Sequence, residues 1–555
     1  MTSALEAARR LSAPQRAELR LRLWRRGLSG AAVGLADEDP APASCGQRAM
    51  VYLHQLAPMS PAYNTPVQCR LSGPLDEDAL RHALDELVRR HDILRTTLPL
   101  DAGRPVQRIA RSSPPLLEVL TPSSSSSEEE AVAASRRTPF DLSAGPLVRA
   151  RLLRLDDRES LLLLTFHHAV IDGWSIGVLT HELSELYTAA VAGRPAALPP
   201  AVPQYAEYAR WQQEWLDSDQ ARRSLSYWLT QLADPPDPLP LPADHSRPAG
   251  HALRGAVHDV LLPAALRDRL DAVARRCGAT QFMVLFALFQ VLLSRVTGAE
   301  DILVGTQLAN RRHTELHNLV GYVSNVVVLR GRPRQASSFA AFLASVRTTC
   351  LDAYEHQELP LDVVVRHLAP RRPAGRNPLF QVGCTLHNTP SPVTTAAGPT
   401  ITPLDAAGDE GARLDLELDA RDSPEGLRCS FTYAADLFDA GTVAEWADAL
   451  VALAREVADD PDTDLRPSPA APRPASPPPV LASVPAGDLS RTVDGLFASV
   501  LDVPVVDPDA DFFDLGGHSL LAVELAARLG APFSLSEWLA GPATARRAAH
   551  LLRRS

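Results

Sequence analysis

The sequence contains no lysine, so all 55 of its basic residues are arginines. This absence excludes any reaction that proceeds through a lysine Schiff base. The chain also has 48 prolines and is rich in alanine. Together these features are typical of a biased genomic base composition, and we attach no mechanism to them.

Cysteine is scarce, and no two cysteines have the spacing of metal ligands. Such scattered thiols are typical of a reducing compartment, so we expect structural cysteines, no metal site and a cytoplasmic location. The six cysteines are residues 45, 69, 277, 350, 384 and 429.

Long apolar segments are also missing. The longest, FMVLFALFQVLL (282–293), is too short to cross a bilayer and predicts a buried helix. The first residues, MTSALEAARRL, carry charges where a signal peptide requires an apolar run. We therefore expect neither membrane insertion nor secretion.

The bulk composition indicates a soluble protein of several folding units. Its 555 residues exceed one ordinary hydrophobic core and favour about three units. The chain is 45% hydrophobic and 22% charged, with a net charge of −11. This acidity argues against binding to nucleic acid or to an anionic membrane.

Residues 14–27, within an N-terminal segment 1–43, predict a short basic amphipathic helix. Its apolar residues either pack on the following domain or form a docking element for an upstream protein. Both interpretations are open at this stage.

From about residue 44 to residue 460 the chain alternates predicted strands and helices, which indicates two α/β lobes, about 44–225 and 226–460. The continuous apolar run LLLLTF (161–166) predicts a strand buried on both faces. The other predicted strands are 67–73, 302–308 and 326–331, and the predicted helices are 75–91, 174–191, 263–276 and 280–296.

The C-terminal part differs in character. Residues 461–488 are rich in proline and predict an extended, semi-rigid linker. Residues 489–555 follow as a separate small all-α bundle. We expect its helices at 491–501, 519–530 and 534–553.

The stretch DADFFDLGGHSLLAVEL (509–525) contains the most specific motif of the chain. Gly516 and Gly517 allow close approach of a partner, and Ser519 stands where a helix begins. A phosphate attached there would be stabilised by the helix N-terminus, although a serine at this place can equally be a simple N-cap. The string resembles the carrier-domain motif of nonribosomal peptide synthetases. The resemblance implies that a separate transferase attaches 4′-phosphopantetheine to Ser519, whose thiol then holds acyl groups as thioesters.

A second chemical motif, HHAVIDGWS (167–175), follows the buried strand directly. Side chains alternate along an extended segment, so His167 and His168 point to opposite faces. One of them can serve a cavity, while the other belongs to the scaffold. Asp172 lies beyond a turn, and Gly173 permits tight backbone geometry there.

Seven segments in order resemble the motifs of the condensation domain of nonribosomal peptide synthetases. This resemblance covers about 44–458 and implies a V-shaped pair of chloramphenicol-acetyltransferase-like lobes with a tunnel between them. The segments are SCGQRAMVYLHQL (44–56), RHDILRTTL (90–98), HHAVIDGWS (167–175), YAEYARWQ (205–212), VGYVSNVVVLR (320–330), HQELPLD (356–362) and GRNPLFQV (375–382).

The reaction that the resemblance implies is amide formation, in which an amine attacks a carrier-bound thioester. His168 would act as the base or hydrogen-bond the amine, and the backbone N–H of Gly173 would stabilise the oxyanion. His167 would serve as scaffold. Asp172 would pair with Arg311, which stands at the matching place, and this pair would be structural.

Several alternatives stay open. Only a linker joins the two domains, without an adenylation domain between them, so a separate adenylation enzyme would load Ser519. The chain's own carrier would hold the acceptor amine, or it would hold the donor for a free or foreign amine. A non-catalytic scaffold that binds carriers and an epimerisation domain are the rival classes. A cyclising or a dual condensing-epimerising type is disfavoured by the motifs present.

Overall fold

The computed structural model describes most of the chain up to residue 465 and shorter pieces beyond it. Contacts divide the chain into two compact units, of which residues 475–555 form the main part of the second. Each unit is described by itself. The described residues are 11–30, 40–56, 58–112, 114, 116–120, 128–247, 254–368, 377, 379–387, 394–395, 399–404, 412–465, 493–494, 496–497, 525, 529 and 544–554.

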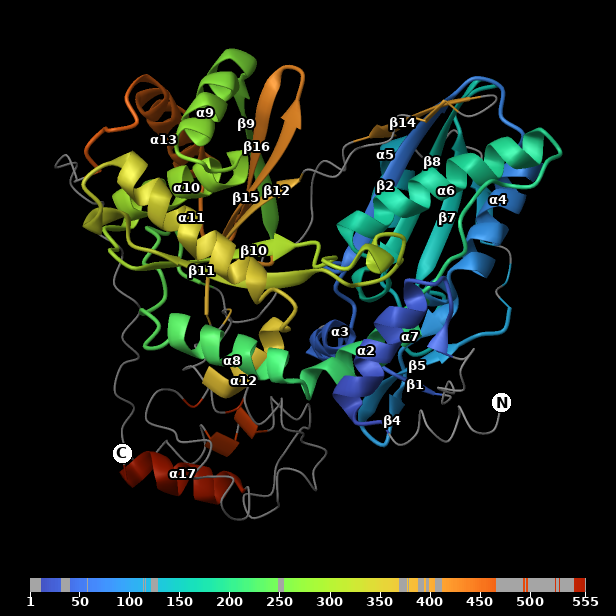
Figure 1. Cartoon of the computed structure of the whole chain (residues 1–555), viewed down its shortest axis with the longest axis horizontal. Coiled ribbons are helices and arrows are strands. Elements are labelled where there is room, and N and C mark those ends of the chain that lie inside the picture. The colour runs from blue at the N-terminus through green and yellow to red at the C-terminus, as the bar shows by residue number, and fades with distance from the viewer. Residues whose placement is uncertain are drawn as a thin grey trace. The chain divides into compact units, whose positions relative to one another are not determined.

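The first unit contains two lobes, each built on a six-stranded mixed sheet (Figure 1). In the first lobe, helix α6 (Gly173–Val191) crosses one face of the sheet, and α4 (Glu77–Arg90) packs beside it (Figure 1). In spatial order its strands are β13 (Thr394–Thr395), β14 (Thr400–Leu404), β2 (Asn64–Ser72), β8 (Glu159–His167), β7 (Val148–Arg154) and β6 (Leu117–Leu120).

Strand β8 is the centre of the first lobe and ends at the double-histidine motif. It pairs antiparallel with β2 on one side and with β7 on the other. Its residues from 160 to 167 are all buried, as the apolar run LLLLTF predicts. Helix α5 (Glu128–Arg137) also contacts this strand.

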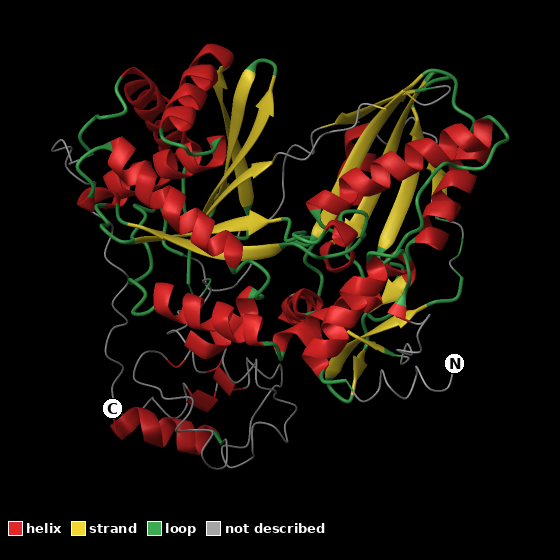
Figure 2. Cartoon of the chain, in the orientation of Figure 1, coloured by secondary structure: helices red, strands yellow, loops and turns green. Residues whose placement is uncertain are grey.

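The second lobe has its helices gathered on one side of its sheet (Figures 1 and 2). These helices are α9 (Ala264–Arg276), α10 (Gln281–Thr297), α11 (Phe339–Glu355) and α13 (Ala440–Asp459). In spatial order the strands are β11 (Asn325–Gly331), β10 (Ile302–Leu308), β12 (Val382–His387), β15 (Leu416–Ser423), β16 (Gly426–Ala434) and β9 (Gly255–Pro263).

The two lobes exchange elements. Strand β14 comes from the second half of the sequence but completes the first sheet beside β2 (Figure 1). Helix α8 (Asp219–Gln231) contacts α12 (Leu361–Leu368), and Trp228 Nε1 donates a hydrogen bond of 3.0 Å to the His356 carbonyl. The lobe boundary predicted near residue 225 therefore falls inside α8, because the chain crosses between the lobes more than once.

A smaller sheet and three helices complete the first unit. The basic N-terminal helix forms as α2 (Ala13–Trp24) and packs on α7 (Tyr205–Leu216). The ring centroids of Trp24 and Trp211 lie 6.3 Å apart. In this structure the apolar face of α2 is therefore covered by α7. The remaining elements are α3 (Cys45–Leu56), β1 (Ala41–Pro42), β3 (Thr96–Thr97), β4 (Leu100–Asp101), β5 (Arg104–Ile109) and the 3₁₀ turns η2 (Asp92–Arg95), η3 (His168–Val170), η4 (Thr314–Leu316) and η5 (Pro333–Gln335).

No single helix among the described residues is both long and apolar enough to cross a membrane. Helices α9 and α10 satisfy the length and composition criteria only together, and they meet at a bend of 101°. Most side chains of α10 are buried in the second lobe.

The second unit is helical where it is described. Its last helix, α17, spans Ala545–Arg554. Val493, Phe497 and Leu525 are buried, as are residues of α17. These residues come from the three predicted helices, so the expected small all-α unit is consistent with its described parts.

Candidate active site

The double-histidine motif forms the connection between β8 and α6. β8 ends at His167, residues 168–170 form η3, and Asp172 caps α6. The Asp172 side chain accepts a hydrogen bond of 2.9 Å from the Ser175 N–H, which is the N-cap contact that aspartate favours. This geometry places His168 directly after the end of a buried strand.

His168 is held in one orientation and one tautomer. Its Nδ1 lies 2.7 Å from the carbonyl oxygen of Ile171, and its backbone N–H donates to the Tyr63 carbonyl at 2.8 Å. A carbonyl oxygen only accepts, so Nδ1 carries the proton and Nε2 carries the lone pair. Within the described part of the chain, no residue is bonded to Nε2.

The same site keeps His168 uncharged. Burial lowers its pKa from 6.5 to about 4, and the nearby Arg413 cation acts in the same direction. The backbone bond to Ile171 and the carboxylate of Asp172 oppose this effect only in part. At neutral pH the imidazole is therefore a neutral hydrogen-bond acceptor.

His167 has different neighbours and is buried in the first lobe. Its Nδ1 accepts a hydrogen bond of 3.1 Å from the Ala169 N–H, and its ring meets Phe140 and His54 edge-on, with centroids 6.1 Å and 5.9 Å away. Burial lowers its pKa to about 3. These contacts are those of a scaffold histidine.

Asp172 and Arg311 form a fully buried ion pair between the lobes. Arg311 Nη1 lies 2.9 Å from Asp172 Oδ2, and the two side chains are 1% and 0% exposed. The carboxylate also accepts bonds from Ser175 and from the backbone N–H groups of Val323 and Ser324, at 3.0 Å each. Burial alone would raise the pKa of Asp172, but Arg311 and Ser175 outweigh it, so the pKa is lowered. The Asp172 carboxylate is therefore held in place, stays ionised and does not act as a proton donor.

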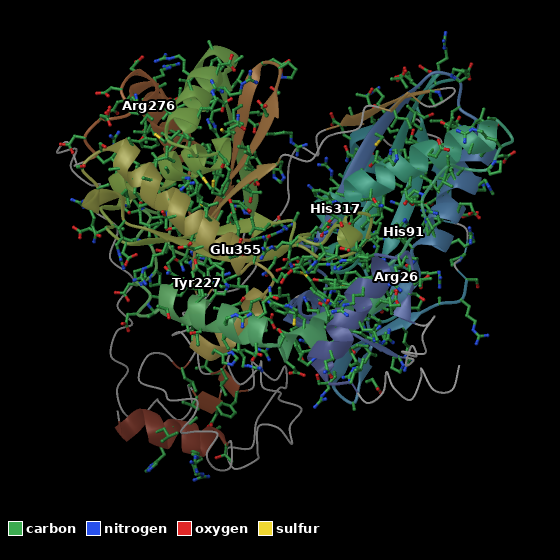
Figure 3. All side chains as sticks on the ribbon, viewed as in Figure 1. Arg26, His91, Tyr227, Arg276, His317 and Glu355 are labelled. Atoms are coloured by element: carbon green, nitrogen blue, oxygen red, sulfur yellow. The ribbon has the colours of Figure 1, made fainter. Side chains whose placement is uncertain are left out.

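The loop that carries Arg311 is anchored to the first lobe at several points. Trp174 Nε1 donates to the carbonyl of His317 at 2.8 Å (Figure 3 labels His317). Gly321 has a φ of +148°, and a Cβ built there would lie 1.9 Å from the Tyr205 ring. Only glycine satisfies both constraints. The Tyr205 hydroxyl in turn donates to the Tyr322 carbonyl at 2.7 Å.

The first motif supports the turn that bears His168. Gln47 Nε2 donates to the Ala169 carbonyl at 3.3 Å, and its Oε1 accepts from the Ser44 N–H. Gln47 is fully buried. Its contribution is therefore to fix the backbone of η3.

Gly173 is placed at the start of α6 with open space before it. A Cβ there would meet no atom within 4 Å, and the residue is exposed. Among the described residues, none accepts a hydrogen bond from its N–H. A free N–H at a helix N-terminus is a suitable donor to a developing negative charge.

Three residues beside His168 were not singled out from the sequence: Tyr63, Tyr322 and Arg413. The rings of His168 and Tyr322 have centroids 4.7 Å apart, and the Arg413 guanidinium carbon lies 5.9 Å from the Tyr63 ring centroid. Tyr322 at least lies within the VGYVSN motif. Arg413 carries no sequence signal, because only the fold brings it to this position.

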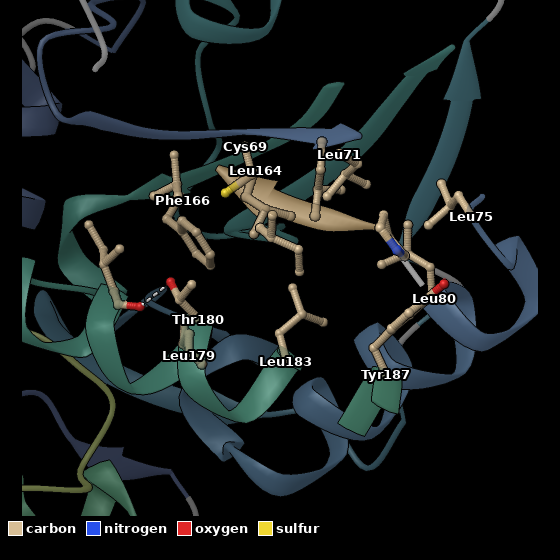
Figure 4. Close-up of a pocket in the computed structure, with 15 residues that line it drawn as sticks. Cys69, Leu71, Leu75, Leu80, Leu164, Phe166, Leu179, Thr180, Leu183 and Tyr187 are labelled. Carbon is tan, nitrogen blue, oxygen red and sulfur yellow. Dashed lines mark hydrogen bonds between the residues drawn. The ribbon is translucent and has the colours of Figure 1, made fainter. Parts of the chain in front are cut away.

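An apolar pocket adjoins the site within the first lobe (Figure 4). It lies between β8 and α6, and Phe166, two residues before His168, is at one end. Its two hydroxyl groups are already bonded: Thr180 donates to the Ile176 carbonyl at 2.7 Å (Figure 4), and Tyr187 accepts from the Asp76 N–H at 3.1 Å. A ligand site needs polar groups that orient the ligand, so we assign no ligand to this pocket.

Ser519, with Gly516 and Gly517, lies outside the described residues, and so does the predicted start of its helix. No group of three or more His, Cys, Asp or Glu that could hold a metal ion occurs within the residues that the structure describes.

Family models match two segments of the chain. The condensation domain matches residues 37–469, and the phosphopantetheine attachment site matches residues 491–536, which include Ser519. The second match assigns 4′-phosphopantetheine as the prosthetic group of the C-terminal domain.

The chain is similar to curated proteins that are named synthetases or synthases. Phosphinothricin tripeptide synthetase PhsC of Streptomyces viridochromogenes is 38% identical over 441 residues, covering 77% of this chain and 40% of that protein. Chondramide synthase cmdD of Chondromyces crocatus is 39% identical over 416 residues, covering 74% of this chain and 11% of that protein. The chain thus spans less than half the length of these relatives.

Solved structures share the fold of the first unit. The X-domain from teicoplanin biosynthesis is 26% identical with a TM-score of 0.71, covering 78% of this chain and 98% of that one. The first condensation domain of the calcium-dependent antibiotic synthetase is 24% identical with a TM-score of 0.66, covering 78% and 99%. These structures agree with the two-lobed α/β fold expected from the sequence. The family match over most of the chain, around the motif that holds His168, shows that the chain belongs to the condensation-domain family of nonribosomal peptide synthetases and continues into a phosphopantetheine-binding carrier domain.

Proposed function

We propose that this chain forms an amide bond between an acyl or peptidyl thioester on another carrier domain and an amine held on its own carrier at Ser519. One observation carries the proposal: His168 is neutral, oriented and, among the described residues, without a partner at Nε2, while Asp172 is paired with Arg311. A scaffold that only bound carriers would not need a histidine held in a single reactive tautomer.

His168 positions the attacking amine. The amine must arrive neutral, because an ammonium group has no lone pair with which to attack the thioester carbonyl. Nε2 then accepts a hydrogen bond from the amine N–H and directs its lone pair to the carbonyl. With a pKa of about 4, His168 is a weak base, so orientation contributes more than proton removal.

Gly173 supplies the second contribution. As the amine adds to the carbonyl, negative charge develops on the carbonyl oxygen. The N–H of Gly173 and the positive end of the α6 dipole stabilise that charge. When the tetrahedral adduct collapses, the C–S bond of the donor thioester breaks, and the departing thiolate takes up the proton that the amine loses. No side chain crowds the approach, because glycine has no Cβ.

The carrier domain holds the acceptor. Phosphopantetheine, attached to Ser519 by a separate transferase, supplies a thiol that carries the aminoacyl group as a thioester. A separate adenylation enzyme loads this thiol in trans, since the first unit and the carrier are joined by a linker alone. We place the reaction in the cytoplasm, in keeping with six cysteines that are all free thiols.

The attachment step is tested by mass. Incubation of the full chain with coenzyme A and a broad-specificity phosphopantetheinyl transferase should raise the intact mass by one phosphopantetheine. Ser519→Ala should abolish the increase. An increase that survives the substitution would place the attachment site elsewhere.

The condensation step is tested by product. The full chain, with an aminoacyl group loaded onto Ser519, is mixed with a synthetic donor carrier that bears an acyl thioester, and the product on each carrier is identified by mass spectrometry. A new amide on the chain's own carrier supports the proposal. A product that forms only when the chain's carrier bears the acyl group would reverse the donor and acceptor. No product in either arrangement, with both carriers loaded, would favour the scaffold class.

A further inference from the structure

Arg413 is a cation at the edge of the site. It lies three residues before β15 in the second lobe, and its guanidinium carbon stands 5.9 Å from the ring centroid of Tyr63. The side chain is exposed, and it makes no hydrogen bond or ion pair with any residue that the structure describes. Arg48, which also lies near the site, is bonded to the Ala43 carbonyl and the Cys45 thiol.

Two phenol groups share this position. The Tyr322 ring centroid lies 4.7 Å from that of His168, and the Tyr63 carbonyl accepts the His168 N–H at 2.8 Å. Neither phenol oxygen is hydrogen-bonded to a residue in the described ranges. Burial raises the pKa of both phenols, to about 12 for Tyr322, while Arg413 acts in the opposite direction on each. Both phenols therefore stay protonated as donors, and the guanidinium is near both.

The chemistry of this cluster fits an anion. Arginine has five N–H donors and no acceptor, and its planar fork matches a carboxylate better than any neutral group. Two protonated phenols near the guanidinium add further donors. A cation beside a partly buried site attracts a negative group more strongly than one in open water does.

We propose that Arg413, Tyr63 and Tyr322 form a carboxylate-binding subsite that selects an acceptor bearing a free carboxylate next to the amine held by His168. The proposal rests on the amide-forming function above and adds a substrate class to it. Two sources supply this chemistry: an acidic side chain of a carrier-bound amino acid, or the α-carboxylate of an unloaded amino acid.

Equilibrium binding distinguishes the sources. The full chain is titrated calorimetrically with three amines of one skeleton: aspartic acid α-amide (side-chain carboxylate), asparagine (α-carboxylate) and aspartic acid diamide (none). We expect one of the two carboxylates to bind about tenfold or more tightly than the diamide, in keeping with a charge-assisted bidentate contact. Arg413→Gln should remove this preference. Arg104→Gln, at an exposed arginine on β5, should leave it unchanged.

Several results would overturn the subsite. They are equal binding of all three amines, a preference that survives Arg413→Gln, and tighter binding of inorganic phosphate than of either carboxylate. Asp409 and Glu410 precede Arg413 in the sequence and lie outside the described residues. The double substitution Asp409→Asn with Glu410→Gln tests whether these two side chains pair with Arg413. If it tightened carboxylate binding more than tenfold, they would be the partners of Arg413. The proposal that Arg413 binds a substrate carboxylate would then be wrong.

Turnover gives the independent readout. With the preferred carboxylate acceptor, Arg413→Gln should raise KM about tenfold or more and change kcat little, because it removes a contact made equally before and during reaction. With the diamide, which has no carboxylate to lose, it should leave KM unchanged. The binding measurement does not depend on a thioester reaction. If the carboxylate preference were present but no amide product formed, the proposed function would be refuted. The carboxylate-binding subsite would still be supported.

Discussion

Arg311 reaches across 139 residues of sequence to place its Nη1 2.9 Å from the Oδ2 of Asp172. The bond joins the start of α6 in the first lobe to the loop before β11 in the second. It also fixes the residue next to Gly173, so the geometry of the proposed oxyanion donor depends on contact between the lobes.

Arg311→Ala should destabilise the first unit strongly. The substitution leaves the Asp172 carboxylate buried without its cation, a change that typically costs about 3–5 kcal/mol. Denaturant unfolding of the full chain measures the loss. Arg104→Ala, at an exposed position, is the matched control and should change the free energy of unfolding by less than about 0.5 kcal/mol. Similar midpoints for both variants would show that the buried pair contributes little.

His168→Ala should lose activity, whereas His167→Ala should lose stability. The first should keep the fold and the loading of Ser519 while amide formation falls by about two to four orders of magnitude. The second should lose stability first, because the Ala169 N–H is left without its acceptor, at about 1–3 kcal/mol. Thermal unfolding and product formation are measured on the same samples. Equal losses of turnover in two well-folded variants would contradict the separation of roles.

Stability should decrease as the pH falls from about 6.5 toward about 4. The pKa values of His167 and His168 are about 3 and about 4 in the folded chain, held there first by burial, against about 6.5 in an unfolded chain. In this window the unfolded state binds more protons, so acid favours unfolding. Denaturant unfolding at several pH values measures the slope. Replacing both histidines should flatten it, and an unchanged slope would show that other groups dominate.

Two glycine positions should respond oppositely to alanine. Gly321→Ala places a Cβ against the Tyr205 ring at a φ of +148°, so we expect a loss of more than about 2 kcal/mol and reduced activity. Gly173→Ala meets no neighbour within 4 Å, so folding should be retained. Its effect should appear in kcat, because the methyl group stands before the N–H that faces the substrate. Unfolding midpoints and kcat for both variants decide the matter, and a destabilised Gly173→Ala would contradict the open space seen there.

Local sequence patterns account for many element positions. Strand β10 spans the same residues, 302–308, as the alternation predicts, and α4 lies within one or two residues of the predicted 75–91. Burial of the run 161–166 also follows from its continuous apolar character. Such features depend on residues that are only a few positions apart, so they can be predicted from the local sequence pattern.

The sequence motifs identified the candidate catalytic residues. They did so mainly because they resemble those of a known family, and less because of the geometry expected for those residues. The string 167–175 pointed to His168, and the family likeness pointed to Arg311. Neither specified the tautomer of His168, because that depends on the carbonyl of Ile171 folding back onto Nδ1.

Taken alone, the sequence determined the two-lobed α/β class, the separate carrier domain and the residues of the double-histidine motif, because each is written in a contiguous pattern. Only the tertiary structure decided that β14 joins the first sheet, that Asp172 is enclosed by Arg311 and the 321–324 backbone, and that Arg413 stands beside Tyr63 and His168. These contacts join residues more than a hundred positions apart. The strand pairing of β14 and the Asp172–Arg311 pair gain their energy from burial, hydrogen bonding and ion pairing that exist only after the chain has crossed between the lobes.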